Sequence, residues 1–179
     1  MLFRSYIGMD HFALPEDALA VAKRQGRLHR NFQGYSTQPD CDLVALGVSS
    51  IGRIGATYSQ NAKTLEAYAD LLEQGHLPIV KGLALSRDDL ARRTIIMALM
   101  CQGRLAFESI EAAHLLSFKE AYKAELAQLS RLQDQGLVRV DDTGIEVTPL
   151  GWFFVRGVAM VFDRHLQSER NHQRFSKII

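Results

Sequence analysis

The sequence predicts an α+β fold in which a few α/β elements come first and a mostly helical domain follows. Three observations predict it. Apolar, strand-like segments at 6–10 and 42–48 flank a short helix, long stretches with helical apolar periodicity follow residue 86, and alternating apolar residues surround a glycine turn within 137–148. The length of 179 residues suits one domain or two small ones.

The first half reads as part of an α/β layer. Residues 6–12 resemble the end of a buried strand that runs into a polar loop, with almost nothing before it to supply neighbouring strands. Pro15, Glu16 and Asp17 are typical of a helix start, and Gly26 ends that helix. We expect a long loop over 27–40 and a second buried strand over 42–48.

A domain boundary is predicted at about residue 85. Before it, 49–55 reads as a turn of small residues, 64–74 as an amphipathic helix closed by Gly75, and 79–81 as a strand. The predicted domains are therefore 1–85 and 86–179.

The second domain is predicted to be winged-helix-like. Ser86 and Asp89 have the spacing that caps a helix start, and that helix is expected to end near Gly103. The remaining elements are helices at 108–115 and 118–134, a β-hairpin formed by 137–140 and 145–148, and a last helix from Pro149 to about 169.

Bulk composition excludes several classes of protein. Lys and Arg total 21 against 20 acids, so no general positive field attracts nucleic acid or anionic lipid. No apolar run is long enough to cross a bilayer, and the N-terminus does not read as a secretory signal, so we expect a cytoplasmic protein without membrane contact. Cys41 and Cys101 lack metal-site spacing, so no cysteine metal site is expected.

Five segments resemble the bacterial oxygen-independent coproporphyrinogen III oxidase family, near its C-terminus. They are Tyr6-Ile-Gly-Met-Asp-His-Phe-Ala13, Leu28-His-Arg-Asn-Phe-Gln-Gly-Tyr-Ser-Thr37, Asp42 through Gly47-Val-Ser-Ser-Ile-Gly52, Gly144-Ile-Glu-Val-Thr148 and Gln173-Arg-Phe-Ser-Lys-Ile-Ile179. The resemblance implies that 1–85 is the end of an incomplete (β/α) radical-SAM barrel and that 86–179 covers the substrate opening.

The same resemblance implies a reaction and its cofactors. The family uses a reduced 4Fe-4S cluster and S-adenosylmethionine to remove hydrogen from a propionate β-carbon of coproporphyrinogen III. Loss of carbon dioxide then leaves a vinyl group, and two propionates react in this way to give protoporphyrinogen IX. The Cys-x-x-x-Cys-x-x-Cys cluster motif of the family is absent from this sequence, so we expect the chain alone to be inactive.

Four candidate site residues follow from the matching positions. Ile51 matches a residue that packs against S-adenosylmethionine, and Gln33 matches a position facing the active site, where its amide could bind that cofactor or a substrate carboxylate. Asp10 and His11 come where a barrel strand reaches its C-terminal mouth, which makes them candidate catalytic residues.

Two other functions compete with this one. A winged helix often binds DNA, but the hairpin carries Asp141, Asp142 and Glu146 against Arg139, which disfavours approach to phosphate. A haem-handling or interaction module from the same radical-SAM family remains the alternative. Because the two predicted N-terminal strands would show unpaired edges, we also expect the chain to self-associate.

Overall fold

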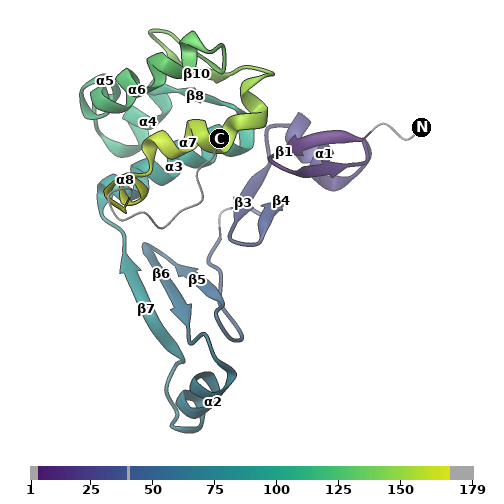
Figure 1. The fold of residues 1–179 in the computed structure, drawn as a ribbon, viewed down its shortest axis with the longest axis vertical. Coiled ribbons are helices and arrows are strands. Elements are labelled where there is room, and N and C mark those ends of the chain that lie inside the picture. Colours follow the sequence, from purple (N-terminus) through teal and green to yellow (C-terminus); the bar gives the residue numbers. More distant parts are fainter. Residues whose placement is uncertain (1–3, 40, 170–179) are drawn as a thin grey trace. The chain divides into compact units, whose positions relative to one another are not determined.

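The structure is a computed structural model that describes residues 4–39 and 41–169. It contains both helices and short strands, as predicted, and divides into two compact units (Figure 1). Within the described residues, unit 1 joins 4–39 to 91–169, and unit 2 comprises 41–90. The change from unit 2 to unit 1 lies inside a helix, a little beyond the predicted boundary at about residue 85. The packing of 4–39 with 91–169 was not expected.

The N-terminal segment of unit 1 begins with a hairpin, so the prediction of an unpaired strand at 6–10 was wrong. Strand β1 (Ser5–Gly8) pairs antiparallel with β2 (His11–Ala13), and Met9 makes the turn with a left-handed φ of 51°. The predicted helix follows as α1 (Ala18–Arg24). Its cap is Asp17, whose side chain accepts a hydrogen bond from the Leu19 amide.

A second hairpin occupies the segment that was predicted to be a loop. Strand β3 (His29–Asn31) pairs with β4 (Gly34–Ser36) in antiparallel register. The turn is stabilised by the Asn31 Oδ1 atom, which accepts a hydrogen bond from the Gln33 amide at 2.9 Å, and by Gly34, whose φ of 131° suits glycine. Polar, turn-forming residues therefore build a hairpin here and not an irregular loop.

Unit 2 is built on a three-stranded antiparallel sheet with the order β5-β6-β7. Its strands are β5 (Ile51–Ile54), β6 (Thr57–Asn61) and β7 (Ile79–Ala84), and helix α2 (Leu65–Glu73) joins the last two. Thr64 caps α2 through its side chain, which accepts from the Ala67 amide. The helix predicted at 64–74 and the strand predicted at 79–81 are confirmed.

The strand predicted at 42–48 does not form, and the turn predicted at 49–55 is mostly strand β5. Leu43 makes only an isolated bridge to Arg53. The buried Asn61 explains the conformation, because its Nδ2 donates to the carbonyl oxygens of Ala45 at 3.3 Å and Gly47 at 3.0 Å. These bonds satisfy backbone groups that would otherwise need a strand partner.

The helical part of the chain begins with α3 (Arg87–Gln102), where the predicted cap is confirmed. The Asp89 carboxylate accepts from the amide and hydroxyl of Ser86, and the Ser86 hydroxyl oxygen accepts from the Asp89 amide. Three more helices follow, α4 (Phe107–His114), α5 (Phe118–Ala121) and α6 (Lys123–Asp134). The helix predicted over 118–134 is thus interrupted at Tyr122.

A small antiparallel sheet with the order β8-β10-β9 completes this part of unit 1. It consists of β8 (Arg104–Ala106), β9 (Val138–Val140) and β10 (Gly144–Val147), and it confirms the predicted hairpin. The last predicted helix is broken into four pieces, η1 (Gly151–Phe154), α7 (Val155–Ala159), η2 (Met160–Phe162) and α8 (Arg164–Glu169). The segment 173–179, which resembles the oxidase family, lies outside the described residues.

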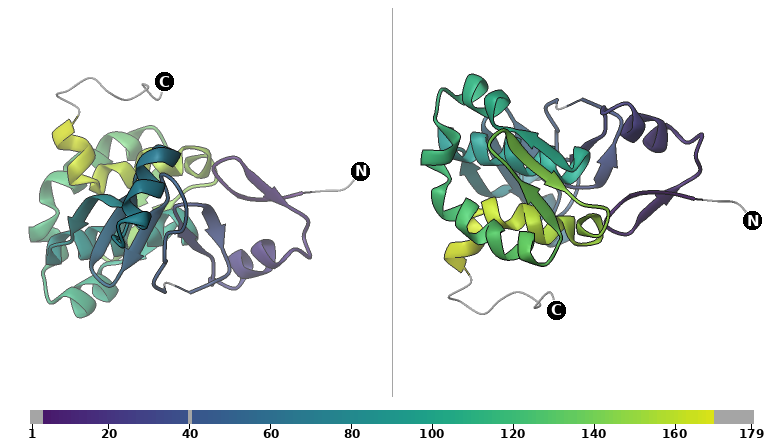
Figure 2. Two further views of the ribbon diagram at one scale, coloured as in Figure 1. Left: turned by 90° about the horizontal axis from the view of Figure 1, so that it is seen from below. Right: turned by 90° about the horizontal axis from the view of Figure 1, so that it is seen from above.

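The core of unit 1 is aromatic. Phe107, Phe118, Tyr122 and Phe162 are all buried, and the rings of Phe107 and Phe118 stack with centroids 4.2 Å apart. Segment η2 packs against α6, and both views in Figure 2 show these yellow and green segments side by side. Each buried ring of this size removes a large apolar area from water, so this cluster is a main source of the stability of the unit.

The N-terminal hairpins are attached to the same unit by polar and aromatic contacts. The Gln102 side chain donates from Nε2 to the Leu28 carbonyl oxygen at 3.1 Å, and the Tyr6 ring stacks on Phe153 with centroids 5.2 Å apart. Every strand pairing among residues 4–39 and 41–169 is antiparallel. The parallel pairing of a (β/α) barrel would therefore need strands from outside these residues.

Candidate functional site

Asp10 and His11 lie together at the turn between β1 and β2. The Asp10 Oδ1 atom is 2.9 Å from the His11 Nδ1 atom, and the Asp10 side chain is 87% exposed. This contact has the distance of an ion pair, but its angles are not those of a hydrogen bond. Asp10 therefore gives His11 a nearby negative charge without fixing which ring nitrogen carries a proton.

Tyr35 holds the His11 ring in place from β4. The two rings meet edge to face, with centroids 5.3 Å apart and an interplanar angle of 84°. The Tyr35 hydroxyl donates to the Met100 carbonyl oxygen at 3.1 Å, which ties the second hairpin to the end of α3. A side chain at Gly8 would collide with Tyr35, because a Cβ atom there would lie 2.3 Å from the hydroxyl oxygen.

Arg30 lies directly across the hairpin from Tyr35, and its Cζ atom is 5.4 Å from the centre of the Tyr35 ring. Burial raises the pKa of the Tyr35 hydroxyl above its ordinary value, and Cys101 adds to this effect. Burial likewise raises the pKa of the Cys101 thiol to about 12, although the positive charge of Arg30 acts in the opposite direction. Both groups are thus uncharged at neutral pH.

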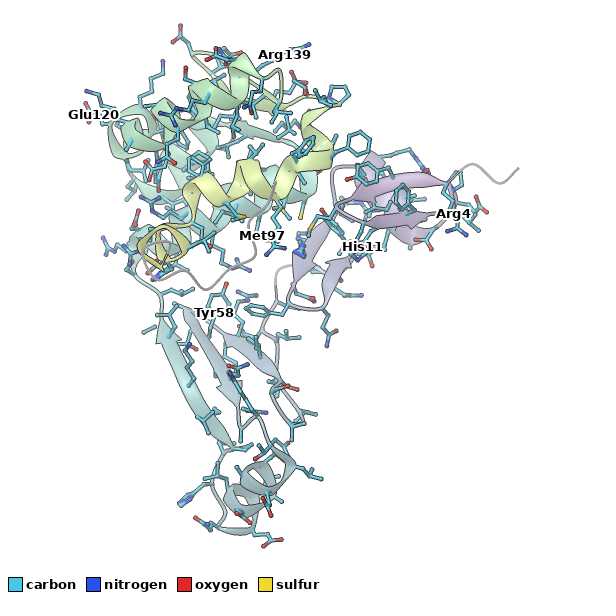
Figure 3. The ribbon with its side chains drawn as sticks, viewed as in Figure 1. Arg4, His11, Tyr58, Met97, Glu120 and Arg139 are labelled. Carbon is cyan, nitrogen blue, oxygen red and sulfur yellow. The ribbon has the colours of Figure 1, made fainter. Side chains whose placement is uncertain are left out.

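Gln33 lies in the turn of the second hairpin and is exposed. The next residue, Gly34, lies close to His11, because a Cβ atom at that position would be 3.4 Å from the His11 Nε2 atom, which is an ordinary contact distance. The structure therefore brings the hairpin that carries Gln33 up to the Asp10–His11 pair, within one unit. Figure 3 labels His11 and shows the side chains around it.

Ile51 lies in the other unit. It is the first residue of β5, pairs with Gln60 on β6 and is half-buried. Its neighbour Gly52 fits tightly under the 41–50 segment, because a Cβ atom there would be 3.1 Å from the Leu43 carbonyl oxygen. Ile51 is therefore held in a paired strand and keeps part of its apolar side chain accessible.

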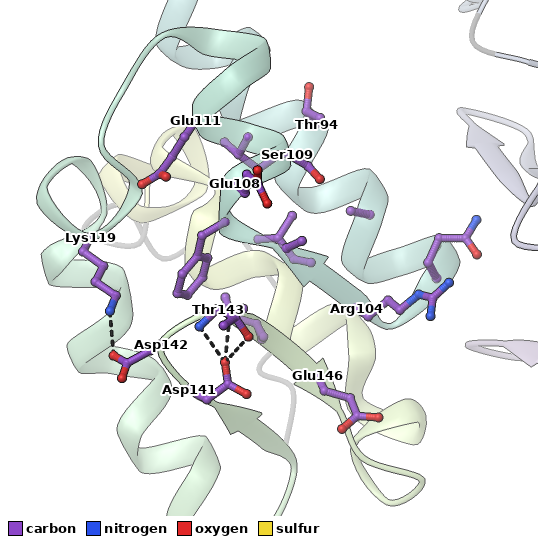
Figure 4. A pocket seen from close by; sticks show the side chains of 18 of the residues that line it. Thr94, Arg104, Glu108, Ser109, Glu111, Lys119, Asp141, Asp142, Thr143 and Glu146 are labelled. Carbon is purple, nitrogen blue, oxygen red and sulfur yellow. Dashed lines mark hydrogen bonds and ion pairs between the residues drawn. The ribbon is translucent and has the colours of Figure 1, made fainter.

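A separate concavity of about 970 Å³ lies over β8 and β10 and contains none of the predicted site residues (Figure 4). Asp141 accepts hydrogen bonds there from the amides of Thr143 and Gly144 and from the Thr143 hydroxyl. These bonds lower the pKa of the Asp141 carboxyl and shape the hairpin turn. The charges around the concavity are mixed, as the Lys119–Asp142 pair at 2.7 Å illustrates, so it does not define one class of ligand.

Sequence reasoning missed Tyr35, which contacts the predicted His11, and Arg30, which contacts Tyr35. Tyr35 reaches a carbonyl oxygen 65 positions away, and no local spacing signals such a bond. Among the described residues, no group of three or more His, Cys, Asp or Glu side chains is arranged to hold a metal ion. Within the same residues, no helix is both long and apolar enough to cross a membrane.

Comparison with known proteins gives consistent matches. Residues 85–154 match the family described as HemN C-terminal domain. The chain is 47% identical over 178 residues to the oxygen-independent coproporphyrinogen III oxidase of Synechocystis sp. and 50% identical over 175 residues to that of Pseudomonas aeruginosa. Each alignment covers 97% of this chain and 38% of the relative, so the chain spans about two fifths of the length of these relatives.

One solved structure matches as well. It is the coproporphyrinogen III oxidase (HemN) of Escherichia coli, described as a radical SAM enzyme, with a TM-score of 0.87 and 46% sequence identity. The match covers 90% of this chain and 37% of that one.

Proposed function

Nearly the whole chain corresponds to the C-terminal part of the oxygen-independent coproporphyrinogen III oxidases, and we propose that it serves in their reaction. That reaction is the oxidative decarboxylation of two propionates of coproporphyrinogen III to vinyl groups, giving protoporphyrinogen IX. The single observation that carries the proposal is an identity of 50% across 97% of the chain with one such oxidase.

The residues of this chain would bind and orient ligands. The exposed Gln33 amide can donate to and accept from a nucleoside or carboxylate edge, and Ile51 can supply an apolar contact to S-adenosylmethionine. Asp10 and His11 remain candidate catalytic residues, because a histidine beside a carboxylate can hold or move a proton. The contact of Tyr35 with the His11 ring would keep that histidine oriented.

The described residues do not provide the ligands of an iron–sulfur cluster. Cys41 is exposed and Cys101 is buried, both are free, and no further acid or histidine joins them in a metal-binding group within 4–39 and 41–169. In enzymes of this kind, a 4Fe-4S cluster with S-adenosylmethionine supplies hydrogen abstraction at the substrate. We therefore propose that the cluster is held by the part of the enzyme that precedes this region and that the isolated chain is inactive.

The domain roles are proposed on the same basis. Residues 1–85 would complete a (β/α) barrel, and residues 86–179 would form the winged-helix-like domain that covers the substrate opening. The match of 85–154 to one family supports a boundary there. The sheet β8-β10-β9, followed by the η1 and α7 segments, supports the comparison with a wing and its flanking helices.

Self-association is part of the proposal, although its structural reason differs from the predicted one. Unit 2 exposes large apolar side chains, among which Leu46 is 82% exposed and Leu77 is 75% exposed. Strand β7 is an edge strand that is exposed along its whole length, so it can pair with another copy. The two free cysteines support a reducing, cytoplasmic location.

A chimeric enzyme tests the proposed function. The N-terminal part of the Pseudomonas aeruginosa relative is joined to this chain, and anaerobic conversion of coproporphyrinogen III is measured by separating the oxidised porphyrin products. We expect conversion by the chimera and none by the isolated chain. A folded chimera with a full iron–sulfur content that converts no substrate contradicts the proposal, and porphyrin binding without conversion favours the haem-handling alternative.

The role of Gln33 is tested in the same chimera. Gln33→Ala is expected to raise the KM for S-adenosylmethionine or for the porphyrinogen about tenfold, because one or two hydrogen bonds to a charged ligand are lost. Gln38→Ala is the matched control, since Gln38 is also an exposed amide close by in the chain. Equal kinetics for both variants rule out a ligand contact by Gln33.

A further inference from the structure

Two nitrogen-bearing side chains flank the Tyr35 ring from different elements of unit 1. Arg30 lies over the ring from β3, with its Cζ atom 5.4 Å from the centroid, and His11 meets the ring from β2, with centroids 5.3 Å apart. Both are only partly exposed. Three elements that are separated in the sequence therefore bring a guanidinium and an imidazole to one aromatic ring.

Both side chains hold a buried nitrogen that makes no hydrogen bond to the described residues. These atoms are Arg30 Nε and His11 Nδ1. A guanidinium is always charged and donates only, so a buried Nε without an acceptor is unfavourable. The Arg30 side chain as a whole is only partly buried, so its other guanidinium nitrogens can still donate to a ligand.

The neighbouring side chains provide a favourable place for the charge of Arg30, but none of the described residues accepts a hydrogen bond from its Nε atom. The Tyr35 ring offers its face, which attracts a cation, but the Tyr35 hydroxyl is directed to the Met100 carbonyl oxygen. Cys101 lies near Arg30 and stays a neutral thiol, because burial raises its pKa to about 12. Asp10 is the acid of this cluster, and its side chain is 87% exposed and lies next to His11.

We propose that Arg30 binds a carboxylate group of a ligand against the Tyr35 ring, with His11 as the other nitrogen-bearing side chain in contact with that ring. A carboxylate matches the planar donor fork of arginine, and such charge-assisted bonds are the strong ones. This inference rests on the proposed function, whose ligands carry carboxylates of two kinds, the propionates of a tetrapyrrole and the amino-acid carboxylate of S-adenosylmethionine. Exposed Asp10 would compete with that carboxylate for His11.

Binding to the isolated 179-residue chain tests the inference separately from any activity. Coproporphyrin III is titrated by its fluorescence, and S-adenosyl-L-homocysteine is titrated by calorimetry. Arg30→Met keeps most of the apolar stem and removes the charge. We expect Arg30→Met to raise the Kd of the ligand whose carboxylate is bound by tenfold or more, and Arg30→Lys to give an intermediate Kd.

Three controls show whether a change in Kd comes from the charge of Arg30 and the carboxylate of the ligand. Arg27→Met changes a nearby exposed arginine, which bonds to Gln25, and should alter Kd less than twofold. Asp10→Asn removes the competing charge and should tighten binding. The tetramethyl ester of coproporphyrin III should bind wild type and Arg30→Met alike. Circular dichroism confirms that each variant is folded.

The outcomes distinguish the two possible sources of the carboxylate. They also distinguish failure of this inference from failure of the proposed function. A loss for coproporphyrin III alone assigns a propionate, and a loss for S-adenosyl-L-homocysteine alone assigns the amino-acid carboxylate. The inference is overturned if Arg30→Met changes neither affinity. It is also overturned if the wild-type chain binds neither ligand at about 1 mM, a concentration that corresponds to very weak binding. The proposed function would be unaffected by that result, because it depends on conversion by the chimera.

Discussion

The ammonium nitrogen of Lys23 lies 4.3 Å from the centre of the Trp152 ring, so a charge from α1 rests on an aromatic residue of η1. The same nitrogen donates to the carbonyl oxygens of Tyr6 and Ile7 at 2.9 and 2.8 Å. Burial lowers the pKa of the Lys23 ammonium. Lys23 therefore joins the first hairpin, α1 and the C-terminal region.

Replacing Lys23 by Met is expected to reduce the free energy of unfolding by about 2–3 kcal/mol, because two carbonyl oxygens lose a charged donor. Urea-induced unfolding followed by circular dichroism measures the change. Lys81→Met alters an exposed lysine on β7 and should change stability by less than about 0.5 kcal/mol. Equal midpoints for the two variants would show that the Lys23 contacts add nothing to stability.

A glycine pair offers a sharper comparison within the C-terminal region. A Cβ atom at Gly151 would lie 1.8 Å from the Leu137 carbonyl oxygen, whereas one at Gly157 would meet nothing within 4 Å. Gly151→Ala should destabilise the chain by about 2–4 kcal/mol, because backbone must move. Gly157→Ala, inside α7, should stabilise it by about 0.5–1 kcal/mol. Thermal unfolding of both variants checks the opposite signs.

The buried Cys101 thiol predicts a loss of stability in alkali. Its pKa is raised to about 12 in the folded chain, so the unfolded chain releases the thiol proton first, above about pH 9. Stability that is fully present below pH 9 should then fall with rising pH, by at most about 1.4 kcal/mol per pH unit. Tyr35 acts in the same direction only above about pH 10, its ordinary pKa.

The contribution of Cys101 is separated by urea unfolding at pH 8, 9, 10 and 11. Cys101→Ala should flatten the decline between pH 9 and 10 and leave the steeper decline above pH 10 in place. Cys41→Ala removes the exposed thiol and serves as the control. An identical pH profile for Cys101→Ala and wild type would exclude this linkage.

Self-association should depend on the apolar surface of unit 2. Leu46→Asp places a charge at a residue that is 82% exposed, and it should shift the sedimentation of the chain toward the monomer at micromolar concentration. Leu115→Asp introduces the same charge in unit 1 at a side chain that is 92% exposed and should leave association unchanged. If the wild-type chain sediments as a monomer, the proposal that the chain self-associates is wrong.

Local signals predicted local structure well. The Ser86 and Asp89 spacing gave the start of α3, and the glycine turn gave the β9–β10 hairpin, because in both cases the stabilising bonds are close in sequence. The segment 42–48 misled for the opposite reason. Its apolar composition indicated a buried strand, but Asn61 fixes it as an irregular segment in which Leu46 is largely exposed.

The candidate site shows the same division. Asp10 and His11 are adjacent, so their pairing could be expected from the chain itself. The contacts of Tyr35 with His11 and with the Met100 carbonyl oxygen join three elements, and they exist only once unit 1 has formed. Unsatisfied buried donors such as Arg30 Nε also follow from tertiary packing and leave no trace in the sequence.

In the sequence, unit 2 lies between the two segments of unit 1, and this order affects the rate of folding. Contacts between 4–39 and 91–169 close a loop that contains the whole of 41–90, and the entropy lost on closing a loop rises with its length. If the β5-β6-β7 sheet forms first, the flexible part of that loop becomes shorter and closure is faster. In that order of events, unit 2 would speed the folding of a unit to which it does not belong.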